Sequence, residues 1–107
     1  MPYDEKLDER ILSGTAGWRL VRKKMFGGTC YLLNGNMMCG VYKNYLIARL
    51  GEEEAERALG ENFVRVFDIT GRPMKGWVMI EEACFKGARL KRWLDRAKAF
   101  AGSLPKK

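Results

Sequence analysis

The residues best suited to covalent or metal chemistry are three cysteines, in a chain of 107 residues that contains no histidine. Without imidazole there is no His-assisted nucleophile, no imidazole acid or base and no His metal ligand. Cys30 and Cys39 lie on either side of Asn34-Gly35, the sequence signal for a tight hairpin turn. Counting strand pairs outward from that turn predicts that the two thiols face each other, within reach of a reversible disulfide or a shared metal.

Three small, buried and reduced thiols are the alternative interpretation of Cys30, Cys39 and Cys84. A structural zinc site usually needs four nitrogen or sulfur ligands, which three cysteines do not supply. We therefore predict no metal and no cofactor, and we keep Cys30 and Cys39 as a candidate redox pair.

Positive charge is concentrated at the end of the chain. The formal net charge is +7, yet residues 1–84 hold 12 basic and 12 acidic residues, so the whole excess lies in residues 85–107. Arg89, Arg92 and Arg96 recur there at the spacing that places side chains on one side of a helix. Such cations suit phosphates or acidic partner groups, while the alternative is a solvated helix face. The candidate binding residues for nucleic acid or an acidic partner are Arg89, Arg92, Arg96, Lys86, Lys91, Arg22, Lys23, Lys24, Arg72 and Lys75.

A glycine-bounded loop before Trp77 is the third candidate site. Pro73 restricts the backbone there, and the glycines on both sides permit tight turns. Such a loop would hold Arg72 and Lys75 beside Trp77, and cations next to an aromatic ring suit a phosphate or a stacked base. In the alternative interpretation, Met74 and Trp77 fill the core while the two cations are solvated.

Carboxylates and hydroxyls provide little for catalysis. The acids of residues 52–56 form the first turns of a predicted helix, and Glu81 and Glu82 begin another segment, so we expect both groups to be solvated. Ser13 and Ser103 lie at segment ends, where capping or turn roles suffice. We therefore predict that the protein is not an enzyme.

Hydrophobic periodicity predicts the α+β elements that must position these groups. Three strands in succession carry large apolar side chains on both faces, so both faces need cover from helices or from another chain. A homodimer is therefore one expectation. The predicted order α-β-β-β-α-β-β-α gives a two-layer fold, an antiparallel sheet of about five strands with helices packed on it. The predicted helices are residues 4–13, 52–59 and 88–101, the predicted strands are residues 26–33, 37–43, 45–50, 63–67 and 77–80, and residues 18–24 are either a strand or a helical turn.

Length and composition fit one domain over residues 1–107, with residues 103–107 as a flexible tail. No run of 18 apolar residues occurs, so we expect no membrane-spanning helix and no membrane partner. The charged N-terminus is followed by no apolar segment of the secretory type, which favours a cytoplasmic protein with reduced thiols.

Two separated motifs resemble those of a known family. One is K-K-M-F-G-G at residues 23–28, and the other is G-R-P-M-K-G-W at residues 71–77. Residues 100–105 also fit the ending F-A-x-S-L-P. In this order the motifs resemble the TfoX N-terminal domain family, also called Sxy-like, over nearly all of the chain. The motif residues that carry this resemblance are Met25, Phe26, Gly27, Gly28, Gly71, Arg72, Pro73, Met74, Lys75, Gly76 and Trp77.

The resemblance implies a two-layer α+β fold like that of secretion chaperones. In the longer founding members this domain precedes a helical domain, and those proteins promote transcription of DNA-uptake (competence) genes alongside a cyclic-AMP receptor protein. The resemblance supplies no catalytic residues. It implies a stand-alone, non-enzymatic regulatory module that contacts a protein partner, here expected to be transcription machinery. The alternatives are a sequence-nonspecific nucleic-acid binder acting through the basic C-terminal helix, and a redox protein using Cys30 and Cys39.

Overall fold

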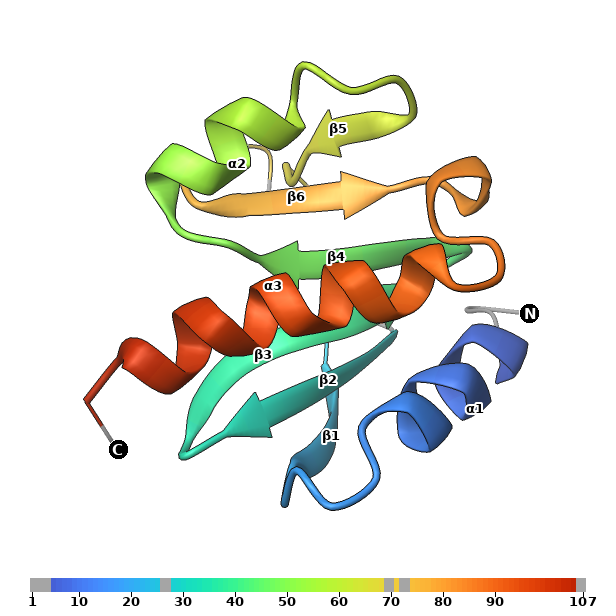
Figure 1. Ribbon diagram of the computed structural model, residues 1–107, viewed down its shortest axis with the longest axis vertical. Helices are drawn as coiled ribbons and strands as arrows, with labels where there is room; N and C mark the ends of the chain where they lie inside the picture. The colour runs from blue at the N-terminus through green and yellow to red at the C-terminus, as the bar shows by residue number, and fades with distance from the viewer. Residues whose placement is uncertain (1–4, 26–27, 69–70, 72–73, 106–107) are drawn as a thin grey trace.

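The computed structural model describes residues 5–25, 28–68, 71 and 74–105 of the chain. Within this part, helices alternate with groups of strands in the order α-β4-α-β2-α (Figure 1). The elements are α1 (Glu5–Gly14), β1 (Val21–Met25), β2 (Gly28–Leu33), β3 (Asn36–Tyr42), β4 (Tyr45–Arg49), α2 (Glu52–Ala58), β5 (Val64–Val66), β6 (Trp77–Ile80), a short 3₁₀ turn η1 (Glu82–Cys84) and α3 (Arg89–Ser103).

The described strands form one open antiparallel sheet in the order β1-β2-β3-β4-β6-β5, which confirms the predicted α+β class. The sheet has six strands where about five were predicted. The additional strand is β1, in the segment that the sequence left open between strand and helical turn. It pairs with β2 and forms an edge, where the charged Lys23 and Lys24 oppose pairing with another chain.

The three helices share one hydrophobic core with one face of the sheet. α3 crosses the middle of that face over β3 and β4, and α1 lies beside it (Figure 1). The predicted apolar stripe of α3 is confirmed, because its periodic side chains are buried against the sheet. The buried helical residues of this core are Leu7 and Ile11 of α1, Ala55 and Ala58 of α2, and Leu90, Trp93, Leu94, Ala97 and Ala101 of α3.

The opposite face of the sheet carries a smaller apolar cluster, so the expectation of apolar side chains on both faces is confirmed. Ile47, Phe67 and Met79 are buried there. Other apolar side chains, among them Met74 and Trp77, pack around them and remain partly exposed. None of the described helices is long and apolar enough to cross a lipid bilayer.

The predicted turn at Asn34-Gly35 is confirmed. Both residues have positive φ, 54° and 83°, as expected for the central pair of a tight hairpin. Leu33 pairs with Asn36 immediately beyond the turn, as counted from the sequence. The Asn36 side-chain amide donates to the carbonyl of Pro105 at 3.0 Å, so Pro105 of the expected tail is attached to this turn, while Ser103 is the last residue of α3.

The register predicted farther along the same hairpin is wrong. An irregularity in the ladder shifts the pairing by one residue, so Cys39 lies opposite Tyr31, and Cys30 lies opposite Gly40. Met38 and Cys39 follow each other and both have 0% exposure in the helix-covered core. A regular strand would send one of them to the other face, so the bulge allows both to be buried together.

Candidate functional site

The three arginines of α3 line one pocket of about 290 Å³, as their spacing on one side of the helix suggested. We call it the arginine pocket. Its lining residues are Arg89, Arg92, Trp93 and Arg96 of α3, Cys84 of η1, and Glu61.

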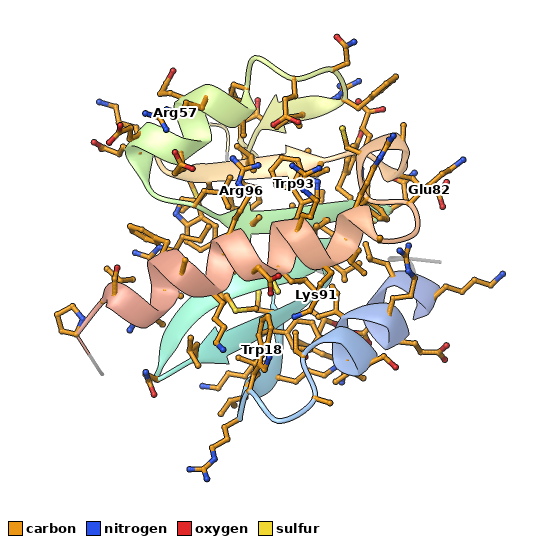
Figure 2. The ribbon with its side chains drawn as sticks, viewed as in Figure 1. Trp18, Arg57, Glu82, Lys91, Trp93 and Arg96 are labelled. Atoms are coloured by element: carbon orange, nitrogen blue, oxygen red, sulfur yellow. The ribbon has the colours of Figure 1, made fainter. Side chains whose placement is uncertain are left out.

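The wall of the arginine pocket is fixed by Trp93. The residue is 4% exposed, and its indole Nε1–H donates to the carbonyl of Cys84 at 2.9 Å. The Cys84 thiol in turn donates to the carbonyl of Asn62 at 3.0 Å, which joins η1 to the segment before β5. The Arg96 guanidinium lies 4.6 Å from the centroid of the Trp93 ring, and both side chains point to the same side of α3 (Figure 2). The ring therefore orients this cation.

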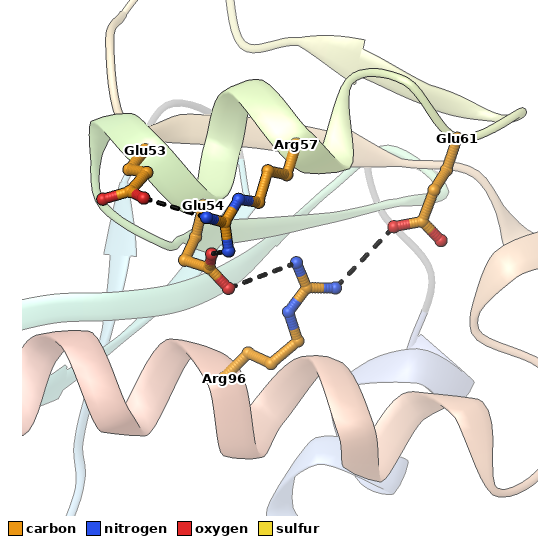
Figure 3. A network of polar contacts seen from close by, with 5 residues as sticks. All are labelled: Glu53, Glu54, Arg57, Glu61 and Arg96. Carbon is orange, nitrogen blue, oxygen red and sulfur yellow. Dashed lines mark hydrogen bonds and ion pairs between the residues drawn. The ribbon is translucent and has the colours of Figure 1, made fainter.

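Arg96 lies between two carboxylates from outside α3 (Figure 3). Its Nη2 is 3.9 Å from Glu54 of α2, and its Nη1 is 3.8 Å from Glu61. Glu54 also pairs with Arg57 at 3.0 Å, and Arg57 reaches Glu53 at 2.9 Å. These groups are substantially exposed, so each pair contributes only about 0–1 kcal/mol to stability.

Arg89 and Arg92 contribute charge that is not balanced locally. Arg89 donates to the backbone carbonyl of Ala83 at 3.0 Å. Within the described part of the chain, neither Arg89 nor Arg92 forms an ion pair. Three guanidiniums therefore face a pocket whose lining includes one carboxylate, that of Glu61.

The lysines of α3 lie on the other side of the helix. Lys91 pairs with Asp95 at 2.9 Å, and its Nζ lies 4.5 Å from the centroid of the Trp18 ring (Figure 2). The Nζ of Lys98 lies 4.6 Å from the same ring centroid. Lys86 is exposed between η1 and α3. The basic residues of α3 are thus divided between two surfaces.

The predicted cluster of Arg22, Lys23 and Lys24 does not act as one group. The Arg22 guanidinium pairs with the buried carboxylate of Asp8 on α1, and the Tyr31 hydroxyl donates to the same carboxylate. Arg22 therefore has a structural role that its sequence position did not reveal. Lys23 and Lys24 are exposed on the edge strand, where alternation points them to opposite faces.

In the loop before β6, the structure favours the interpretation in which apolar side chains pack inward. Met74 and Trp77 pack on the second apolar cluster, and the Trp77 and Phe67 ring centroids are 5.7 Å apart. Lys75 is exposed. A cation does stack on Trp77, but it is Arg49 of β4, 5.2 Å from the ring centroid.

Part of the family motif lies outside the described residues. Phe26, Gly27, Arg72 and Pro73 belong to that part. Gly28 has a clear steric role, because a Cβ at this position would lie 1.9 Å from the carbonyl oxygen of Val41.

Gly71 and Gly76 both have φ of +88°, a conformation that favours glycine. The carbonyl of Gly76 accepts bonds from the amides of Leu50 and Gly51 at 2.8 and 3.1 Å. This motif glycine therefore supports the turn that leads from β4 into α2.

The two hairpin cysteines are free thiols that lack the predicted face-to-face pairing. Burial raises the pKa of both, and the neighbouring Cys30 raises the pKa of Cys39 further. Both effects disfavour the reactive thiolate. The redox pair stays a prediction. The described residues include no group of three or more cysteine, aspartate or glutamate side chains that could hold a metal.

Sequence reasoning missed Trp93, Glu54 and Glu61 as parts of the site. Trp93 belongs to the apolar stripe, and a stripe residue is normally assigned to the core. The two glutamates lie more than 30 residues before Arg96, and only the sheet topology brings them to it. The one available signal was the spacing of Trp93 and Arg96 at i, i+3, which allows a ring and a cation to stack on a helix.

Comparison with known families gives one match. Residues 16–101 match the family model described as TfoX N-terminal domain. No curated protein and no solved structure matches the chain. The matched range contains the whole arginine pocket and every described strand.

Proposed function

Because the chain belongs to the TfoX N-terminal domain family, whose domain is regulatory and not known as catalytic, we propose that it is a non-enzymatic regulatory module. It acts in the cytoplasm through protein–protein contacts in the control of transcription. Its contact surface is the arginine pocket, and its partner presents acidic side chains there.

The observation that carries this proposal is the convergence of Arg89, Arg92 and Arg96 on one pocket. Guanidinium groups bind carboxylates and phosphates through paired N–H donors, which gives both strength and direction. Like charges gathered on one helix face also repel each other at some cost in stability. An acidic group bound between them would relieve that repulsion.

The surroundings of the pocket favour a discrete acidic group over a nucleic-acid backbone. Glu61 lines the pocket, Glu54 lies 3.9 Å from its Arg96, and the lysines of α3 are on the other side of the helix. A phosphate backbone is a continuous line of negative charge, which nearby carboxylates repel. A single acidic side chain can enter between them.

One observation favours nucleic acid as a second candidate. Lys91 and Lys98 converge on Trp18 at 4.5 and 4.6 Å, and cations beside an aromatic ring suit phosphates and bases. An electrophoretic gel shift over a salt series tests it. Binding that weakens steeply with salt supports this candidate, and no shift at about 50 mM salt removes it, because nonspecific binding is strongest at low ionic strength.

A nuclease-treated pull-down tests the main proposal. The immobilised protein should retain a protein partner from lysate, and the double variant R89Q/R92Q should lose it. The matched control is K23Q/K24Q, which removes the same charge from two exposed positions on β1. Circular dichroism should show that both variants are folded. Equal retention by wild type and R89Q/R92Q, or loss of the partner on nuclease treatment, would contradict the proposal.

A further inference from the structure

The arginine pocket offers more hydrogen-bond donors than a carboxylate can use. One guanidinium already satisfies one carboxylate through two parallel bonds. Here Arg89 and Arg92 add their donors to those of Arg96. In the described structure Arg96 has two weak ion pairs, whereas Arg89 and Arg92 have none. A group with more oxygens and more charge would use this set more fully.

We infer that the group bound by the arginine pocket is a phosphate monoester, carried by a phosphorylated side chain of the partner protein. This inference rests on the proposed function. A phosphate monoester has three terminal oxygens and about −1.5 to −2 charges at neutral pH. Three guanidiniums around a concave site match that charge and that number of oxygens.

The pocket is large enough for such a group. Its volume of about 290 Å³ corresponds to roughly ten water molecules at the volume each occupies in the liquid. A phosphoryl group with the first atoms of its side chain fits in this space. The buried indole of Trp93 fixes one wall, and the ring holds the Arg96 guanidinium in place before any ligand arrives.

The carboxylates of Glu54 and Glu61 lie near the Arg96 guanidinium but interact with it only weakly. Their oxygens lie 3.9 and 3.8 Å from the guanidinium, beyond hydrogen-bond distance (Figure 3). A phosphate oxygen bound to a guanidinium would approach to roughly 2.7–2.9 Å. Glu61 lines the pocket and its side chain is 51% exposed, so it can rotate into solvent when the phosphate enters.

The carboxylate of Glu61 therefore competes with the ligand, and removing its charge should strengthen binding. E61Q should tighten phosphate binding two- to fivefold, because Gln keeps the shape without the charge. E53Q is the matched control. Glu53 lies on α2 close to Glu54 but pairs with Arg57 and not with Arg96. The same loss of charge at Glu53 should change affinity by less than half as much.

The experiment is a titration of the isotope-labelled protein by NMR, followed at the Trp93 indole N–H and the arginine side chains. The probes are N-acetyl-phosphoserine amide, N-acetyl-glutamic acid amide, N-acetyl-serine amide and inorganic phosphate. Phosphoserine should bind at least tenfold more tightly than glutamate, and serine should not bind. R92Q should weaken phosphoserine binding at least tenfold, while K23Q, an equal charge change on the edge strand, should leave it nearly unchanged.

Three results would overturn the inference. Equal affinities for phosphoserine and glutamate would mean that the pocket takes any acidic group, and the proposed function would stand without the phosphate. Inorganic phosphate binding as tightly as phosphoserine would identify a site for the free ion. If phosphoserine causes no response while the pull-down still captures a partner through Arg89 and Arg92, the phosphate inference is refuted and the proposed function stands. If the pull-down captures no such partner, the proposed function itself fails.

Discussion

The buried ion pair between Asp8 and Arg22 should contribute much more to stability than any exposed pair in the described structure. Asp8 is only 6% exposed although it is an aspartate, because it lies on the core side of α1 near Leu7 and Ile11. Its carboxylate accepts hydrogen bonds from the Arg22 guanidinium and from the hydroxyl of Tyr31, which is 1% exposed. The residue thus joins α1 to two neighbouring strands.

The magnitude follows from the bonds that change in Asp8→Asn. Asparagine keeps the shape and one acceptor oxygen but loses the charge. A hydrogen bond to a charged group contributes about 1.5–3 kcal/mol, against about 0.5–1.5 for a neutral one. The bonds from both partners, Arg22 and Tyr31, weaken, so D8N should lower the free energy of unfolding by about 2 kcal/mol. The matched control is D95N, which breaks the exposed pair with Lys91 and should cost about 0.2–0.5 kcal/mol.

Urea unfolding followed by tryptophan fluorescence measures both changes, and equal m-values would show that the two variants unfold to comparable states. A third variant, D8A, removes the acceptor as well and should cost about 1 kcal/mol more than D8N, because the buried Tyr31 hydroxyl then loses its side-chain partner. If D8N and D95N lower stability by the same small amount, the buried carboxylate does not have the role assigned to it.

Two further predictions concern packing and thiol chemistry. Gly28→Ala should lower the free energy of unfolding by about 2–3 kcal/mol, because the new methyl group meets backbone on β3. Gly102→Ala in α3, whose Cβ has 3.8 Å of space, should be neutral or raise stability by up to about 1 kcal/mol, and equal effects of the two changes would contradict the steric argument. At pH 8, Ellman's reagent should react with Cys84 first and with Cys30 and Cys39 only on unfolding, because burial raises the pKa of both. Loss of two thiols under mild oxidation, without dimer on a non-reducing gel, would instead support the redox pair.

The sequence predicted the fold well where the signals were local. Strand β6 and the Asn34-Gly35 turn lie where periodicity and turn residues placed them. The helix at the end of the chain has its predicted buried stripe and extends two residues farther, to Ser103. These features are determined by residues close to one another in the chain, so a short stretch of sequence is enough to predict them.

The errors arose where distant residues decide the outcome. The bulge at Met38 lets the successive side chains Met38 and Cys39 both be buried under α3. Counting strand pairs from the hairpin turn takes no account of this distant packing. Similarly, Arg49 stacks on Trp77 because β4 pairs with β6, although nearer cations were available in the sequence. The cations expected beside Trp77 were Arg72, which lies outside the described residues, and Lys75, which is exposed; the pairing of β4 with β6 brings Arg49 there instead.

The residues of the arginine pocket differ in how much the fold depends on them, so the proposed binding should be adjustable without loss of the fold. Trp93 belongs both to the core and to the pocket wall, so its substitution would change stability and binding together. Arg96 is oriented by that rigid ring, which reduces the entropy lost when a ligand orders it. Glu61 lies on a different segment, is exposed and contributes little to stability. E61Q should therefore change the affinity for the ligand and leave the free energy of unfolding nearly unchanged. W93F should change both, so measuring affinity and stability for the two variants separates the residue that only adjusts binding from the one that the fold also requires.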